Sequence, residues 1–462
     1  MRLMEAQAPK QTKRTTLWIT GAVVIVAVAV AVLAVWTLTK PPSAAVGAIS
    51  AYTLDNGLRV IVYQDTTAPV VSVNVWYRVG SRDEPPGKRG MAHLMEHMAY
   101  KGSKNVGPEE HSKLIDQAGG QDNAFTADDV TGYWARLPKE KLDLALYLFA
   151  EQMHNLVLTQ EHLDSEREVV KEEWRVRLEN QPVSKAFDKF RDIAFAGTPY
   201  AKGPEGYMED LDNITLEDLQ NFYQTYYAPN NAVLVVAGDV RPDEVLSLAK
   251  KHFGGIPKAQ LPPPIQISLP PQTQMREETL EMAVQLPVII GGYQLPGSGH
   301  PDQPILEIAS FILSRGQSSR LYKQLVREQQ ISVAAGGFPL VFKDLGTMLI
   351  YAFFTPDKDP AQVKEALLAE IERLASEPID DKELQKAKNQ LTAQYIFGLD
   401  SLSSVANELA EAEVIYGDYR EFEKAKTKYD AITAADVQRV AQTYFKRENL
   451  TIVTLKPEGG AQ

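Results

Sequence analysis

A short run with two histidines and a glutamate constrains this chain more than any other part of its sequence. Residues 91–103 contain His93, Glu96 and His97, spaced His-x-x-Glu-His. On a helix, positions i, i+3 and i+4 share one face, so both imidazoles can reach one Zn²⁺ while the carboxylate between them stays free. Zinc lowers the pKa of a bound water toward neutrality, and a neighbouring glutamate can accept the proton. The run therefore predicts a hydrolytic metal site with Glu96 as its catalytic base.

A plainer explanation of the run is also open. With 7 His in 462 residues, such a triplet can arise by chance on an amphipathic helix whose histidines are ordinary core or surface residues. A catalytic zinc usually takes three protein ligands and keeps one position open, so a third ligand must come from elsewhere in the chain. The other histidines stand singly, form no second zinc motif, and read as ordinary surface or core residues: His111, His154, His162, His252 and His300.

Composition excludes several classes of function. The chain has no Cys, which rules out disulfides, thiolate zinc sites and cysteine nucleophiles, and which fits export to an oxidising space. The net charge of -12 and the lack of an extended basic patch argue against nucleic-acid binding. A hydrophobic content of 44% and a charged content of 23% are ordinary for globular proteins, and 462 residues predict two to three domains.

An uncharged apolar stretch lies near the N-terminus. Residues 17–38 carry no charged side chain, and about 20 apolar residues suffice to span a bilayer as a helix. Four basic residues precede the stretch and Lys40 follows it, so the positive-inside rule predicts that residues 1–16 are cytoplasmic and that the rest is exported. A cleaved signal peptide with a small-residue site near 43–45 is the alternative, but the run is long for one. We therefore favour an uncleaved transmembrane anchor.

A stretch of sequence near the middle of the chain is repeated near its end. The repeated residues, each pair 218 positions apart, are Gln224 and Gln442, Thr225 and Thr443, Tyr226 and Tyr444, and Asn231 and Asn449. Both copies read as a helix, a turn and a terminal strand, which indicates two homologous domains. The same offset leads from His93 and His97 to Phe311 and Arg315, so only the first copy can hold the metal.

These patterns predict an α+β architecture of two homologous α/β domains after the N-terminal transmembrane helix. Each domain is expected to have a mixed, largely antiparallel sheet flanked by helices. The metal-bearing domain is predicted at 48–258, and the domain without a metal site at 273–458. The Pro-rich run at 259–272 reads as a stiff linker. Within the first domain, Asn-Gly at 56–57 predicts a hairpin, and 70–79 alternates as a further strand.

Together these features resemble the pitrilysin/insulinase family of zinc peptidases, the M16 peptidases, whose motif reverses the more common His-Glu-x-x-His. The resemblance covers about 48–458. The family takes its third zinc ligand from a helix of pattern Glu-Arg-x-Val-x-x-x-Glu, which residues 166–173 match. The resemblance implies one zinc per chain, with Glu173 as the third ligand. It also implies that Glu166 supports the site without binding the metal.

The resemblance also implies substrate-binding residues. Asn123, Ala124 and Phe125 match an edge strand that pairs with extended peptides, a sequence-tolerant mode of binding. Complete family members add an Arg and, seven residues later, a Tyr, both facing the zinc site. Arg327 fits the Arg, but the position seven residues on is Ala334. A shift of the chain within 331–338 is the remaining way to supply an equivalent of the Tyr.

The function that the resemblance implies is zinc-dependent endopeptidase activity on short or unfolded peptides inside a closed chamber. Because the Tyr is missing, the chain is expected to form a heterodimer with a paralogous subunit that supplies the Arg/Tyr pair, with a homodimer as the alternative. We expect a bacterial inner-membrane protein, anchored through residues 17–38, with its catalytic domains in the periplasm. No nucleic-acid partner is expected. A non-catalytic scaffold subunit of a membrane complex is the competing function, although scaffold relatives usually carry a degraded zinc motif.

Overall fold

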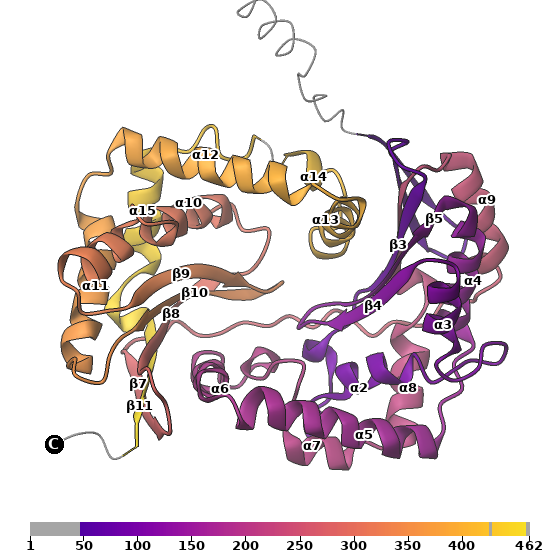
Figure 1. Cartoon of the computed structure of the whole chain (residues 1–462), viewed down its shortest axis with the longest axis horizontal. Helices are drawn as coiled ribbons and strands as arrows, with labels where there is room; N and C mark the ends of the chain where they lie inside the picture. The colour runs from indigo at the N-terminus through magenta and orange to yellow at the C-terminus, as the bar shows by residue number, and fades with distance from the viewer. Residues whose placement is uncertain (1–46, 425–426, 459–462) are drawn as a thin grey trace, which may run out of the picture. The chain divides into compact units, whose positions relative to one another are not determined.

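Two mixed sheets, one in each half of the chain, organise the computed structural model (Figure 1). The structure describes residues 47–424 and 427–458, so the predicted membrane anchor at 17–38 lies outside the described residues. Within the described ranges, no helix has both the length and the apolar character that crossing a membrane requires. Residues from Ala48 onward form one compact unit.

The first sheet has six strands in the order β1-β2-β6-β3-β5-β4. β2 and β6 run parallel, and the other neighbours are antiparallel. The predicted Asn-Gly hairpin joins β1 to β2, and Gly57 takes a φ of +89° there, which glycine adopts at little cost. The strands are β1 Ala48–Thr53, β2 Arg59–Gln64, β3 Val70–Tyr77, β4 Gln121–Thr126, β5 Thr131–Pro138 and β6 Ala232–Gly238.

One face of the first sheet carries the core of the first half. Alternate residues of β2, β3, β5 and β6 pack there against apolar residues of α2, α4, α8 and α9, as the period of two along each strand requires. The helices of this half are α2 Met91–Met98, α3 Glu110–Gln117, α4 Leu142–His154, α5 Gln160–Trp174, the π-helix η3 Arg175–Glu179, α6 Pro182–Ala194, α7 Met208–Asn213, α8 Leu216–Tyr226 and α9 Pro242–Phe253. Single 3₁₀ turns are η1 Ser81–Asp83, η2 Lys139–Lys141, η4 Pro199–Ala201 and η5 Pro229–Asn231.

The second sheet repeats the first without a counterpart of β1. Its order is β7-β11-β8-β10-β9, with β7 and β11 parallel and the other neighbours antiparallel. The strands are β7 Arg276–Met282, β8 Val288–Pro296, β9 Ala334–Val341, β10 Leu345–Phe353 and β11 Leu450–Pro457. The helical segments are α10 Gln303–Ser314, the π-helix η6 Tyr322–Glu328, α11 Pro360–Ser376, α12 Asp381–Gly398, α13 Leu402–Ile415, α14 Glu421–Lys424, α15 Ala434–Tyr444 and the 3₁₀ turn η7 Arg447–Asn449. The structure thus confirms two α/β domains whose mixed sheets are flanked by helices.

The 218-residue offset of the sequence also relates the ends of two helices. α8 starts at a capping box in which Thr215 and Asp218 bond each other's backbone N–H groups. α15 starts at the same box, formed by Thr433 and Asp436. Such a box satisfies N–H groups that the first helical turn leaves unpaired.

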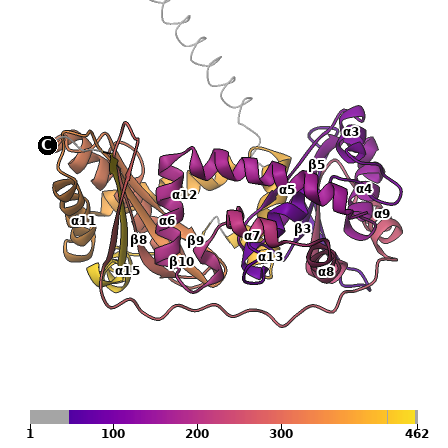
Figure 2. The same cartoon turned by 90° about the horizontal axis from the view of Figure 1, so that it is seen from below.

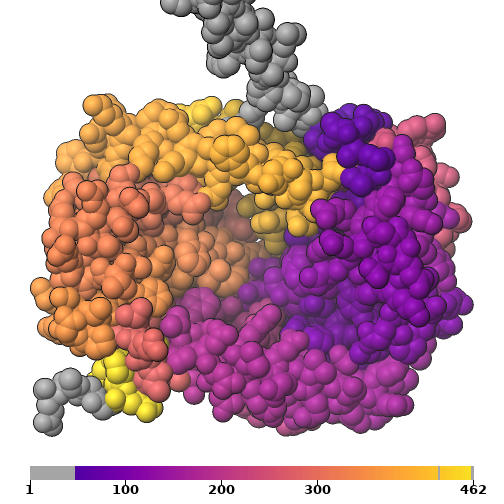
Figure 3. Space-filling view, in the orientation of Figure 1, coloured from indigo at the N-terminus to yellow at the C-terminus, as the bar shows by residue number. Residues whose placement is uncertain are grey.

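Each half contributes one helix to the sheet of the other half. α13 places Val405, Leu409 and Val414 in one apolar cluster with Ile61 and Val235 of the first sheet. α6 reciprocates, because its buried Phe190 belongs to a cluster of second-sheet residues. Fully burying one Val, Leu or Phe side chain stabilises a fold by about 1.5–3 kcal/mol. The exchange of these two helices therefore holds the halves together. In the space-filling view the surface is hollowed between the orange helices of the second half and the magenta helices of the first (Figure 3).

The segment between α9 and β7 contains neither helix nor strand and runs extended from one half to the other (Figure 2). A buried arginine ties it down. The Arg82 guanidinium donates to the carbonyl of Ile265 in this segment at 2.8 Å. It also pairs with Asp129 of the first half at 2.9 Å and with Asp344 of the second at 2.7 Å. One side chain therefore joins the linker to both halves.

Candidate metal centre

The helix α2 is held in the first half by its apolar residues. Met91, Leu94, Met95 and Met98 are at most 2% exposed and pack in the core of the first half. These positions occupy one side of the helix, so His93, Glu96 and His97 are left on the side that faces α5 and β4. The hydrophobic pattern of the run, rather than any property of the histidines, therefore sets the direction in which the three polar side chains point.

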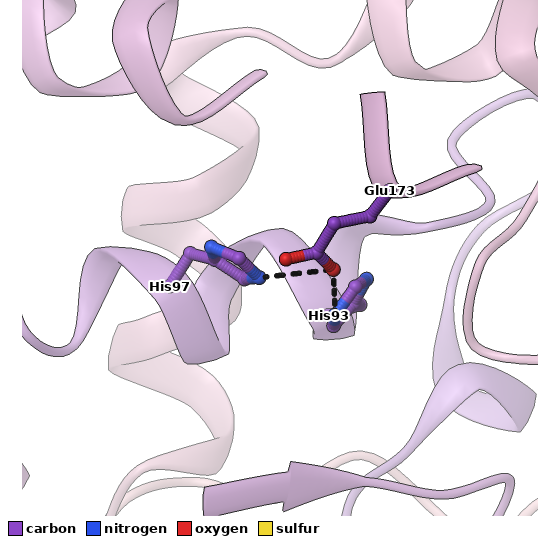
Figure 4. A group of neighbouring side chains, drawn as sticks. All are labelled: His93, His97 and Glu173. Carbon is purple, nitrogen blue, oxygen red and sulfur yellow. Dashed lines mark ion pairs between the residues drawn. The ribbon is translucent and has the colours of Figure 1, made fainter. Parts of the chain in front are cut away.

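Two imidazoles and one carboxylate meet in front of this helix (Figure 4). His93 Nε2 lies 3.6 Å from an Oε2 atom of Glu173 on α5, and His97 Nε2 lies 3.8 Å from the same oxygen. One potential ligand atom from each of the three residues lies within 4.8 Å of the other two. Among the described residues this is the one group of three or more such side chains that could hold a metal ion.

The arrangement fits Zn²⁺. Zn–N and Zn–O bonds of about 2.0–2.2 Å in a tetrahedral site place neighbouring ligand atoms roughly 3.3–3.6 Å apart. The separation of 3.6 Å lies at the upper end of that range, and the separation of 3.8 Å exceeds it by only about 0.2 Å. Two histidines and one glutamate are also a donor set that catalytic zinc sites use. Burial lowers the pKa of His93 to about 4, with His97 adding to the effect, so the His93 imidazole is neutral and able to bind a metal at pH 7.

The third predicted ligand depends on the length of α5. Thr159 caps this helix by accepting the backbone N–H of His162. Glu166 and Glu173 are seven residues apart, two turns of helix, so both face α2. The helix changes to a π-helix directly after Trp174, one residue beyond Glu173. Such π-segments are frequent at functional sites.

Glu166 supports His97 from behind. Its Oε2 lies 3.2 Å from His97 Nδ1, and its Oε1 pairs with Lys101 at 2.9 Å. A carboxylate at Nδ1 favours the tautomer that carries its proton there and leaves Nε2 free for a metal. The resemblance to the family predicted that Glu166 supports the site. No sequence pattern predicted the contact between Glu166 and Lys101, although Lys101 follows His97 by four residues.

Glu96 does not join the cluster of potential ligands. Its carboxylate accepts a hydrogen bond from the Thr126 hydroxyl at 2.5 Å, and that hydroxyl belongs to the edge strand β4. Burial raises the pKa of Glu96, while the bond from Thr126 opposes this. Glu96 is therefore a half-buried carboxylate that is electrostatically coupled to His97 and Glu173 of the cluster.

The remaining predicted site residues lie on two different elements. Asn123, Ala124 and Phe125 lie on β4, which is an edge strand paired with β5 alone. Arg327 lies on η6 in the second half, where it is exposed and forms no ion pair with another described residue. Ala334 is paired with Phe353 at the start of β9, in regular strand rather than a loop. The structure therefore brings β4 to the cluster but gives Arg327 no contact there.

Comparison with known proteins also distinguishes the first half, which holds the cluster, from the second half. The family model described as "Insulinase (Peptidase family M16)" matches residues 59–204, which include the cluster. The model described as "Peptidase M16 inactive domain" matches residues 213–391, where the sequence has no second metal motif.

Individual relatives match nearly the whole chain. The zinc protease PqqE of Helicobacter pylori is 34% identical over 410 residues, which are 88% of this chain and 92% of that protein. An uncharacterized zinc protease of Mycobacterium leprae is 30% identical over 403 residues, 86% of this chain and 89% of that protein. The crystal structure of a protease from Helicobacter pylori matches with a TM-score of 0.84 and 34% identity, covering 89% of this chain and 100% of that one. With the motif, the fold and these relatives in agreement, the chain belongs to the M16 family of peptidases.

Proposed function

We propose that this protein is a zinc-dependent endopeptidase that hydrolyses short or unfolded peptides. The observation that carries the proposal is the meeting of His93 and His97 Nε2 at one oxygen of Glu173, with Glu96 beside them on the same helix. His93, His97 and Glu173 are the residues that would hold one Zn²⁺. When bound, zinc acts as a Lewis acid that polarises a peptide carbonyl and makes water a better nucleophile near neutral pH.

In this proposal Glu96 moves the proton. Its carboxylate takes a proton from the attacking water as the water oxygen forms a bond to the carbonyl carbon. It then gives that proton to the amide nitrogen as the C–N bond breaks. The raised pKa of Glu96 brings its proton affinity closer to that of a base working near neutral pH. Glu166 holds the His97 ring so that Nε2 faces the cluster.

The edge strand β4 is the proposed docking site for the peptide. An unpaired strand edge offers a row of main-chain N–H and C=O groups, and an extended peptide can add to it with little dependence on its sequence. Asn123, Ala124 and Phe125 are the residues we assign to this role. Strand pairing requires an extended chain, which accounts for the proposed preference for short or unfolded substrates.

The second half raises the question of a partner. Since Ala334 stands where the family has a Tyr, we propose that a paralogous subunit supplies an Arg/Tyr pair and that the two chains enclose a chamber. Arg327 is the residue of this chain assigned to substrate binding in the second half. We propose further that residues 17–38 anchor the protein in a bacterial inner membrane, with the peptidase domains in the periplasm.

The test is a cleavage assay with the full-length, zinc-loaded protein and a quenched unstructured peptide. Cleavage should disappear with a chelator and return with zinc. Glu96→Gln should lower turnover by at least about 100-fold while zinc stays bound, because general acid–base catalysis contributes about 10²–10⁴-fold. Glu172→Gln, which neutralises an exposed acid next to Glu173, is the matched control and should keep full activity.

Three outcomes would change the proposal in different ways. Zinc binding without cleavage by the chain alone would lead to the same assay with paralogous partner chains. Zinc binding without cleavage under every pairing would favour the non-catalytic scaffold function. No zinc binding, or Glu96→Gln turnover equal to the wild type, would remove the peptidase proposal.

A further inference from the structure

Thr126 is placed so that one residue touches both the catalytic base and the strand edge that faces solvent. Its hydroxyl donates to Glu96 Oε2 at 2.5 Å. This bond leaves the other oxygen of Glu96 free to exchange a proton. Glu96 and Thr126 are 30 residues apart in the sequence, so this contact exists only in the folded chain.

The main chain of Thr126 faces the open edge of β4. The N–H of Ala127 bonds to Val130 across the turn into β5, so Ala127 and every second residue before it point their N–H groups toward β5. The residues between them, Ala124 and Thr126, therefore direct their N–H and C=O groups away from β5, toward the free edge. The N–H of Ala124 bonds to the side chain of Asn123 at 2.9 Å instead of to β5, in agreement with this alternation.

The side chains of these residues point the other way from Phe125. Phe125 packs on Trp76 with ring centroids 5.0 Å apart, on the face of the sheet that α13 covers. Ala124 packs on the core cluster that contains α2. The period of two along a strand then puts the Thr126 side chain on the α2 face, where the hydrogen bond to Glu96 confirms it.

We propose that Thr126 is a positioning residue that couples peptide docking on β4 to the orientation of Glu96. This inference rests on the proposed peptidase function. A peptide that pairs with the edge at Ala124 and Thr126 fixes the strand, and the strand fixes the carboxylate through the Thr126 hydroxyl. A misplacement of about 1 Å in a catalytic group can cost roughly 100-fold in rate, so a single hydroxyl can matter here.

The test compares two variants that differ in the hydroxyl. Thr126→Val keeps the shape and removes the donor, whereas Thr126→Ser keeps the donor. Thr126→Val should lower kcat about 10–100-fold and change KM less than about twofold, and Thr126→Ser should recover kcat to within about threefold of the wild type. Ser112→Ala removes a hydroxyl bond of 2.7 Å to Asp122 on the same strand and should leave kcat unchanged.

Three readouts do not depend on activity. Zinc affinity, and peptide affinity measured in the Glu96→Gln background, should be the same with Thr126 and with Val at position 126. Crystal structures of the zinc-loaded Thr126→Val protein should show the Glu96 carboxylate turned away or in several orientations, with β4 unmoved.

The outcomes separate this inference from the proposed function. If the wild type cleaves no peptide under any pairing, the proposed function fails, and the crystal structures alone judge Thr126. An unchanged Glu96 orientation in Thr126→Val would overturn the inference. So would a rise in KM at constant kcat, or a loss of kcat that Thr126→Ser does not restore.

Discussion

The Glu84 carboxylate accepts the backbone N–H of Ala92 at 2.7 Å, and its second oxygen accepts that of Gly90 at 3.0 Å. These N–H groups belong to the start of α2, where a helix has no internal partners for them. Gly90 itself has no side chain to cap the helix, so a glutamate from the preceding loop does so. Glu84 is 3% exposed, and its position therefore controls where the histidine-bearing helix begins.

The stability of the metal-free protein should depend on pH through Glu84. Burial raises the pKa of Glu84 to about 8, although both N–H bonds favour the ionised form. Because the folded-state pKa lies above the ordinary value of 4.5, the folded state holds the proton more tightly between these values. The contribution of Glu84 to stability is thus present in full below pH 4.5 and is lost as the pH rises through about 8. The slope is at most about 1.4 kcal/mol per pH unit.

Thermal unfolding of Glu84→Gln from pH 5 to 8 would measure this slope. The amide of this variant cannot titrate, so the thermal midpoint of the variant should fall less than that of the wild type as the pH rises. Glu140→Gln changes an exposed glutamate and should keep the wild-type slope. Equal slopes in Glu84→Gln and the wild type would show that Glu84 titrates alike in the folded and unfolded states.

Glu166→Gln should weaken zinc binding without removing it. The amide cannot act as a charged partner for His97 Nδ1, and it also leaves Lys101 without one of its carboxylates. Loss of such a supporting group typically costs about 10–100-fold in metal affinity. Competition with a chromophoric chelator would measure the effect, and Glu161→Gln, an exposed acid on the same helix, should bind zinc like the wild type. An unchanged zinc affinity in Glu166→Gln would mean that the Glu166 carboxylate serves only as the ion-pair partner of Lys101 and does not support the metal site.

The repeated asparagines should contribute to stability in both halves. Asn231 donates to the Tyr226 carbonyl at 2.9 Å, and Asn449 donates to the Tyr444 carbonyl at 2.9 Å. Replacing either with Ala leaves a carbonyl unpaired, which costs about 1–3 kcal/mol when the group is buried. Asn231 is 5% exposed and Asn449 is more accessible, so Asn231→Ala should lower the thermal midpoint further. Asn221→Ala, at an exposed position of α8, should leave the thermal midpoint unchanged. Equal effects of all three substitutions would show that Asn231 and Asn449 contribute no more to stability than an exposed asparagine does.

Local patterns predicted a large part of this structure. The Asn-Gly turn and the alternation in β3 each involve residues close together in the chain, where spacing determines geometry. The spacing of His93 and His97 on α2 follows from helical periodicity in the same way. The 218-residue repeat could be recognised in the sequence because both copies keep the Tyr and the Asn that bond to each other across the same turn.

Contacts between distant segments could not be predicted from such patterns. Glu84 and Thr126 are polar residues without a periodic signal, and their partners become evident only when the loops are placed. The exchange of α6 and α13 between the halves is a stronger case. Amphipathic spacing identifies the apolar face of a helix, but it does not say which of two similar sheets that face will cover.

The helix exchange predicts that damage in one half will be detected in the other. Leu409 on α13 is 0% exposed and lies in one cluster with Trp76 of the first sheet. Leu409→Ala should cost about 2–5 kcal/mol, since it leaves a cavity between α13 and that sheet. The second half contains no Trp, and Trp76, Trp134 and Trp174 lie in the first half, so tryptophan fluorescence reports unfolding of the first half although the substitution lies in the second.

The matched control is Leu374→Ala, because Leu374 on α11 is also 0% exposed but packs in the core of the second half. Leu409→Ala should lower the fluorescence midpoint more than Leu374→Ala does, relative to the midpoint seen by circular dichroism. A fluorescence midpoint that Leu409→Ala leaves at its wild-type value would mean that α13 adds nothing to the stability of the sheet it covers.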